Sequence, residues 1–75
     1  MDEKGSKLVR LNNGSFYAGN IKNNRPDGEG KEFMEDGISY VGNFKDGYWS
    51  GVGYLVDSEN YICYGEFLEG RVVGI

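Results

Sequence analysis

The sequence predicts an all-β protein, and three observations lead to this class. The 75 residues include 13 glycines, where about five would be usual for this length. Glycine at this density weakens a helix by up to about 1 kcal/mol per interior position. The six Tyr, four Phe and one Trp give more aromatic surface than a disordered linker has. The third observation is a 23-residue repeat in which the residues alternate as they do in strands.

The first predicted strand of each repeat carries three positions that recur at 23-residue intervals. They are Tyr17, Tyr40 and Cys63, then Gly19, Gly42 and Gly65, then Ile21, Phe44 and Phe67. Because alternate residues of a strand point to the same side, the three positions of each repeat share one face. We therefore predict strands over 17–21, 40–44 and 63–67, with their aromatic side chains in the core.

A second strand is predicted about ten residues later, over 28–34 and again over 51–56. Each begins with a Gly-x-Gly element, formed by Gly28 and Gly30 and then by Gly51 and Gly53. The segment 8–11 takes this position in an incomplete leading unit, and the last unit ends at Gly74 before its second strand. One repeat domain is expected over 7–75, after a frayed or disordered 1–6. Its parts are a half unit 7–16, repeats 17–39 and 40–62, and a partial repeat 63–75.

The turns between these strands also repeat. One set of equivalent positions holds Asn24, Gly47 and Gly70, and the other holds Gly14, Gly37 and Asn60. Glycine and asparagine tolerate positive φ at the lowest cost, so a left-handed residue is predicted in every hairpin. Glycine inside the strands predicts close packing, with the aromatic ring of one unit over the glycine of the next.

The run Tyr40-Val41-Gly42-Asn43-Phe44, followed by Gly51-Val52-Gly53-Tyr54-Leu55, resembles a MORN repeat. The resemblance extends from about Ser6 to the end of the chain. It implies a single-layer antiparallel meander of stacked β-hairpins. MORN arrays are known as binding modules and scaffolds, and a role in phospholipid binding has been proposed for the family. The chain departs from the pattern at Glu32, where the family has an apolar residue, and at Cys63, where it has tyrosine.

Composition excludes several classes of function. The chain has one cysteine and no histidine, which excludes an intrachain disulfide, a Cys/His zinc site and a Ser-His or Cys-His dyad. We expect no enzyme activity, no cofactor and no metal. A net charge of −4 argues against direct nucleic-acid binding. The sequence lacks a signal peptide and a transmembrane run, which favours a cytoplasmic location. Cys63 is expected to be a buried, inert thiol.

Two surfaces are predicted to bind a protein partner, as in an interaction module, scaffold or adaptor. The first is a loop rim with Tyr48 and Trp49 after Phe44, and with Arg25 and Arg71 in the equivalent loops. Trp, Tyr and Arg dominate interface hot spots, although Trp49 has the alternative role of closing a thin core. The second surface is the open sheet face, lined by Phe16, Val41, Tyr54, Val56, Ile62 and Tyr64.

Three further hypotheses concern other partners. Anionic phospholipid headgroups would bind to cations in the loops, which are Lys22, Arg25, Lys45 and Arg71. A small inhibitor would cover a partner's functional surface with the acidic turns, which include Glu35, Asp36 and Glu59. A homodimer would form through the edge strands near 8–11 and 61–67, because unprotected edges tend to pair.

Overall fold

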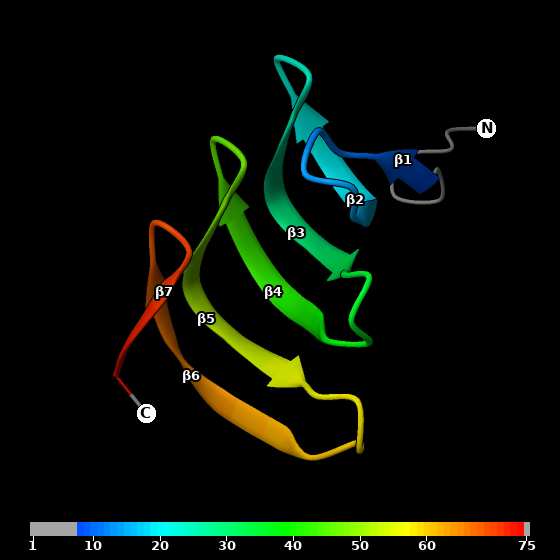
Figure 1. Ribbon diagram of the computed structural model, residues 1–75. Coiled ribbons are helices and arrows are strands. Elements are labelled where there is room, and N and C mark those ends of the chain that lie inside the picture. Colours follow the sequence, from blue (N-terminus) through cyan, green and yellow to red (C-terminus); the bar gives the residue numbers. More distant parts are fainter. Residues whose placement is uncertain (1–7, 75) are drawn as a thin grey trace, which may run out of the picture.

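The computed structural model describes residues 8–74, which form one open antiparallel sheet (Figure 1). Each strand pairs only with its neighbours in sequence, so the predicted all-β meander is confirmed. The expected frayed segment 1–6 lies outside the described residues. The strands are β1 Leu8–Arg10, β2 Phe16–Lys22, β3 Arg25–Phe33, β4 Ser39–Lys45, β5 Tyr48–Val56, β6 Ile62–Leu68 and β7 Arg71–Gly74.

Two-residue turns connect β2 to β3, β4 to β5 and β6 to β7. Both residues of each turn have positive φ: Asn23 and Asn24, Asp46 and Gly47, Glu69 and Gly70. Two left-handed residues in succession match the twist of the flanking strands. The longer turns carry the other predicted set, Gly14, Gly37 and Asn60, with φ of 92°, 94° and 72°. The left-handed residue predicted in every hairpin is therefore confirmed.

The tightness of these turns corrects the predicted loops. Tyr48 and Trp49 are the first residues of β5, not part of a loop, and Arg25 is likewise the first residue of β3. A two-residue turn leaves no room for a loop after Phe44. The third repeat also begins a second strand where none was expected, because the turn at Glu69 and Gly70 leads directly into β7.

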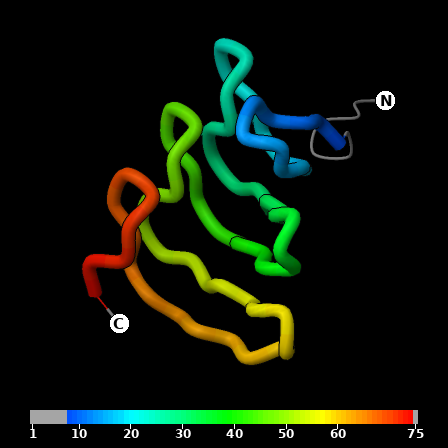
Figure 2. The backbone as a smooth tube through the Cα atoms, viewed as in Figure 1, coloured from blue at the N-terminus to red at the C-terminus, as the bar shows by residue number. Residues whose placement is uncertain are grey.

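Successive hairpins are joined at their tips as well as along their strands. The Gly47 amide donates to the Pro26 carbonyl at 2.8 Å, and the Gly70 amide donates to the Trp49 carbonyl at 3.1 Å. Pro26 and Trp49 are equivalent positions of the repeat, so the same contact recurs one unit later. The three tips follow one another along one side of the sheet (Figure 2).

The core lies on one side of the sheet only. Its buried aromatic residues are Tyr17, Tyr40, Phe44 and Phe67, which were predicted for this face. The Phe44 ring meets Tyr17 and Tyr40 edge to face, at centroid distances of 4.9 and 5.2 Å. Ile21, the equivalent residue of the first repeat, is 44% exposed, because among residues 8–74 no tyrosine of a preceding unit packs against it.

Each buried tyrosine lies over glycines of its own repeat. A Cβ on Gly42 would lie 2.7 Å from Tyr40 Oη, and one on Gly53 would lie 2.6 Å from Tyr40 Cζ. The Tyr40 hydroxyl donates to the Asn43 carbonyl at 2.9 Å, and Tyr17 bonds the equivalent carbonyl. The sequence had suggested that the ring of one unit covers the glycine of the next unit, and this prediction is wrong. The ring stays over its own repeat because the hydroxyl is bonded within its own hairpin.

Cys63 is exposed, so the expectation of a buried thiol is wrong. It stands at the repeat position of Tyr17 and Tyr40, beside Leu55 of β5. On its other side β7 pairs only with Glu66–Leu68 of β6. The thiol remains uncovered because β7 does not extend along this half of β6 within the described residues.

Gly53→Ala should destabilise the fold, because the added methyl group would overlap the Tyr40 ring. Overpacking of this kind costs about 1–3 kcal/mol. Gly74→Ala is the matched control, since its Cβ would have its nearest neighbour at 3.6 Å. Urea unfolding of both variants checks the prediction, and equal midpoints would contradict it.

Stability should fall as the pH rises from about 10 to about 12. Burial raises the pKa of Tyr17 to about 12, and the Asp27 carboxylate adds to the rise; burial also raises the pKa of Tyr40. An unfolded tyrosine titrates near pH 10, so above this pH the unfolded chain holds fewer protons than the folded one. Urea unfolding at several pH values measures the decline, which Tyr17→Phe should make shallower. An unchanged slope in that variant would count against this cause.

Candidate functional site

The face opposite the core carries a second set of apolar side chains. Directly opposed residues of antiparallel strands share a face, and Tyr54 of β5 is opposite both Val41 of β4 and Tyr64 of β6. The register places all six predicted residues there and adds Phe33 and Val52. The alternation of residues within the predicted strands 28–34 and 51–56 was enough to assign Phe33 and Val52 to this face. We define the open face by its apolar residues Phe16, Phe33, Val41, Val52, Tyr54, Val56, Ile62 and Tyr64.

A shallow groove of about 660 Å³ crosses the open face over four strand glycines, Gly19, Gly30, Gly42 and Gly53. Val41, Val52, Tyr54 and Tyr64 line it, together with polar side chains such as Asn43. Tyr64 is 66% exposed and Val52 63% exposed. The Tyr54 and Tyr64 rings lie 5.3 Å apart in a tilted pair. The groove thus offers aromatic and aliphatic contact area with a few hydrogen-bonding groups, a combination typical of recognition sites.

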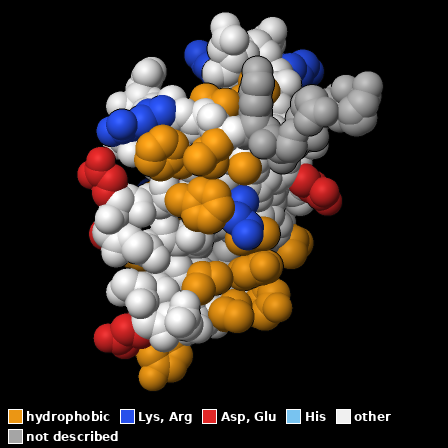
Figure 3. Space-filling view, turned by 90° about the vertical axis from the view of Figure 1, so that its right-hand side faces the viewer, with side chains coloured by type: hydrophobic (Ala, Val, Ile, Leu, Met, Phe, Trp, Pro, Cys, Tyr) orange, Lys and Arg blue, Asp and Glu red, His pale blue; other side chains and the backbone are white. Residues whose placement is uncertain are grey.

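Cationic side chains cover two of the rings on this face. Lys31 Nζ lies 5.6 Å from the Phe33 ring centre, and the Arg10 guanidinium lies 5.3 Å from that of Phe16. Figure 3 shows one side of the molecule on which hydrophobic side chains gather in adjacent groups with a cationic side chain among them. The same face also carries carboxylates, since Glu29 lines the groove and Glu66 is opposite Val52. Its charge is therefore mixed, and its aromatic and aliphatic side chains suit a partner that presents apolar groups.

Trp49 belongs to the structural part of the molecule. Its ring stacks on Tyr40 with centroids 4.6 Å apart and planes 7° apart, and it meets the Phe67 edge at 5.7 Å. Its Nε1 donates to Glu32 Oε1 at 2.9 Å. The alternative in which Trp49 closes a thin core therefore describes its contacts. Its neighbour Tyr48 is 57% exposed and remains on the surface.

Glu32 forms the centre of a buried polar cluster that the sequence did not predict. It is 5% exposed and accepts hydrogen bonds from Ser15 Oγ at 2.6 Å and from Asn13 Nδ2 at 3.4 Å, besides that from Trp49. Three donors offset the cost of burying a carboxylate. The only sequence signal was an acidic residue at a position where the family resemblance calls for an apolar one.

The four cations considered for lipid binding all lie at the hairpin tips and are exposed. Lys22 and Arg25 are opposed across the first tip, whereas Lys45 and Arg71 belong to separate hairpins. Carboxylates of the same rim alternate with them: Asp27, Asp46 and Glu69. Asp27 Oδ2 also accepts the Asp46 amide at 3.1 Å. The rim is therefore of mixed charge and holds no cluster of cations alone.

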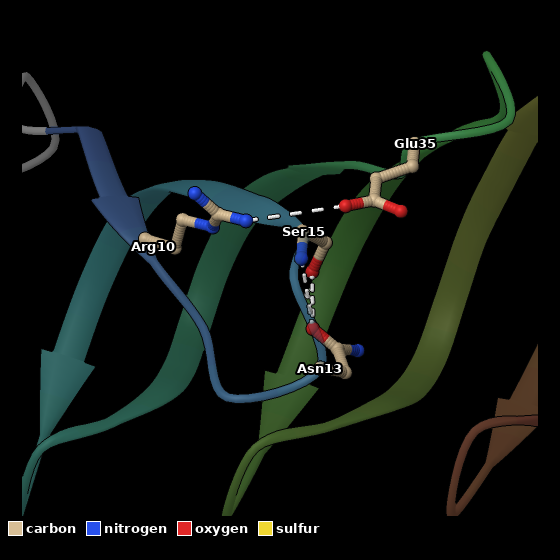
Figure 4. A network of polar contacts seen from close by, with 4 residues as sticks. All are labelled: Arg10, Asn13, Ser15 and Glu35. Carbon is tan, nitrogen blue, oxygen red and sulfur yellow. Dashed lines mark hydrogen bonds and ion pairs between the residues drawn. The ribbon is translucent and has the colours of Figure 1, made fainter.

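The opposite ends of the strands carry the acidic turns. Figure 4 shows Arg10 and Glu35 pointing toward one another, 3.9 Å apart and both exposed, above the turn in which Asn13 Oδ1 accepts from the Ser15 amide. Ser15 Oγ, whose proton goes to Glu32, lies 2.7 Å from the same Asn13 oxygen. Asp36 accepts the Ile38 amide within its own turn at 3.2 Å, and Asp57 accepts those of Glu59 and Tyr61 at 2.9 and 3.0 Å. The two aspartates thus fix the turns, while Glu35 and Glu59 are exposed to solvent.

Within residues 8–74 no three His, Cys, Asp or Glu side chains are placed to hold a metal ion. The same part of the chain contains no helix long and apolar enough to cross a membrane. Comparison with protein-family models and with curated proteins finds no match. The arrangement of residues on the surface therefore carries the functional argument.

Trp49→Phe should destabilise the protein although the ring is kept. The change removes the donor to Glu32, and a hydrogen bond to a charged group contributes about 1.5–3 kcal/mol. Tyr48→Phe is the control, because Tyr48 is exposed, and a substitution there should change stability by less than about 0.5 kcal/mol. Urea unfolding compares the two variants. Equal stabilities would mean that the hydrogen bond to Glu32 contributes little.

Proposed function

We propose that this chain is a MORN-type repeat module that binds a protein through its open face. The observation that carries the proposal is the exposed apolar surface around the groove. Large exposed apolar patches are uncommon on monomeric proteins, and those that occur usually mark interaction sites. The proposed activity is non-enzymatic binding, as in a scaffold or adaptor in the cytoplasm, with neither a cofactor nor nucleic acid involved.

The single-layer sheet supports this proposal. Tyr17 and Tyr40 are fully buried on one side, whereas Val52, Ile62 and Tyr64 on the other side are more than half exposed. In a sheet with one buried face, the second face is normally polar. Burial of apolar surface contributes about 25 cal/mol per Å², so a partner that covers these side chains gains affinity from surface that the fold itself leaves in water.

The hairpin tips provide a second contact region beside this face. Arg25, Tyr48 and Arg71 occupy equivalent positions of the repeat and are all exposed, so they recur along one rim. Tyrosine and arginine are enriched among hot-spot residues. Trp49 supports this rim from the core and is not assigned a contact with the partner.

Affinity capture from a lysate of the source cell, followed by binding measurements with the purified captured protein, tests the proposal. The open-face variant Tyr54→Ser/Tyr64→Ser should weaken binding at least about tenfold, as the loss of hot-spot side chains does. The rim variant Arg25→Ala/Tyr48→Ala should weaken it less. Circular dichroism must show that both variants remain folded.

Undiminished binding by the open-face variant would overturn the assignment of the site. Capture of no protein, combined with sedimentation with anionic vesicles that salt abolishes, would favour the lipid hypothesis instead. In that case Lys45→Glu/Arg71→Glu should release the chain from the vesicles, whereas the open-face variant should not.

A further inference from the structure

One half of β6 has no partner on its outer side within residues 8–74. β5 pairs with β6 from Ile62 to Phe67, but β7 pairs only with Glu66–Leu68. In the preceding repeats, β3 and β5 each cover the full length of the strand before them. The segment Ile62–Gly65, which includes the exposed Cys63, is therefore an open sheet edge.

The main-chain groups along this edge can be assigned from the turn before it. The Asp57 amide donates to the Tyr61 carbonyl at 3.0 Å, so Tyr61 faces β5. Because these groups alternate along an antiparallel strand, Ile62 and Tyr64 direct theirs away from β5. They are the hydrogen-bonding groups that an added strand would meet.

β7 supplies only the first half of the strand that would pair with β6. β1 occupies the repeat position of the second half. At the 23-residue period, Leu8–Arg10 corresponds to 31–33 of β3 and 54–56 of β5, whereas β7 corresponds to the first part of these strands. Among the residues that the structure describes, β1 pairs with β2 alone. The Leu11 amide donates to the Ser15 carbonyl of the following turn at 2.8 Å, so the main-chain groups of Leu11 face β2. Because these groups alternate along the strand, those of Leu8 and Arg10 point to the outer edge.

We propose that β1 of one molecule pairs with the open half of β6 of another, so that copies associate head to tail. The register follows from β2 and β3, where Tyr17 is opposite Glu32 and Ala18 is opposite Lys31. The β6 residues follow the β2 residues by two repeat periods, and the β1 residues precede the β3 residues by one period. The same register therefore places Val9 opposite Cys63, Leu8 opposite Tyr64 and Arg10 opposite Ile62. The added β1 and the resident β7 together form one complete second strand.

The side chains of the two edges match in this register. Leu8 and Tyr64 are 61% and 66% exposed, and pairing places them side by side on the open face. Val9 covers the Cys63 thiol on the core face, at the position where Leu55 packs beside Tyr40. Opposed apolar side chains of this kind stabilise antiparallel pairs. The contact covers apolar groups that each molecule exposes at its two ends.

Charge favours the head-to-tail arrangement over a two-fold pair of β6 strands. Residues 8–26 contain three cationic side chains and no acidic one, whereas 57–74 contain four acidic side chains and one cationic one. Head-to-tail contact brings opposite charges together, and a two-fold contact would oppose two acidic ends. Because the interface joins two different edges, association continues beyond the dimer.

Sedimentation and thiol cross-linking test this proposal together. The average mass of the wild type should rise with concentration past that of a dimer, and less so at high salt. In Val9→Cys, diamide should take up a proton and an electron from each of two thiols and leave a ladder of disulfide-linked species. Peptide mapping should identify links between positions 9 and 63, which within one molecule lie on β1 and β6, about 24 Å apart at the usual strand spacing.

The controls separate the alternatives. Val9→Cys/Cys63→Ser should form no ladder, because each molecule then has one thiol. Because Cys63 is the sole thiol of the wild type, rapid conversion of most of the wild type by diamide into a Cys63–Cys63 dimer would indicate two-fold pairing and overturn the proposal. A monomeric mass up to the millimolar range would also overturn it, and so would a rising mass without links between 9 and 63. The wild-type measurement stands even if a variant fails to fold.

Discussion

The packing of tyrosine rings on glycines is the contact on which the rest of this structure depends. Tyr17 and Tyr40 lie over glycines, at positions where any side chain would collide with the ring. Each hydroxyl then bonds a carbonyl of its own hairpin. The ring thus holds the two strands of its own repeat together. Phe44 and Phe67 pack against the edges and faces of the tyrosines. A chain of 75 residues without a disulfide thereby obtains a compact aromatic core.

This arrangement uses only one side of the sheet. The rings are large enough to make a core without a second layer, and so the opposite face is left with its own apolar side chains in water. Trp49 and Glu32 extend the core beside Tyr40, where the indole and two polar neighbours donate to a buried carboxylate. The same construction that stabilises the repeats therefore provides the surface to which we assign binding.

The ends of the sheet follow different rules from its middle. Phe44 is buried between Tyr17 of the preceding repeat and Tyr40 of its own, whereas Ile21 and Cys63, near the ends, are exposed. Stability in a repeat array comes from contacts between neighbours, so some positions that the central unit buries are exposed in the terminal units, whereas Tyr17 and Phe67 remain buried there. The difference is largest at β6, because β7 is shorter and pairs with only part of it.

The sequence by itself determined the repeat period, the strand faces and the left-handed turns, because glycine, asparagine and alternating apolar residues act through local backbone geometry. We did not predict that Tyr48 and Trp49 begin a strand, although Asp46-Gly47 is a pair typical of a two-residue hairpin turn. The left-handed Glu69 of the last turn, by contrast, is not recognisable from residue type. Only the tertiary structure decided the roles of Glu32 and Cys63. Their burial depends on which strands lie beside them, and that is a property of the assembled sheet.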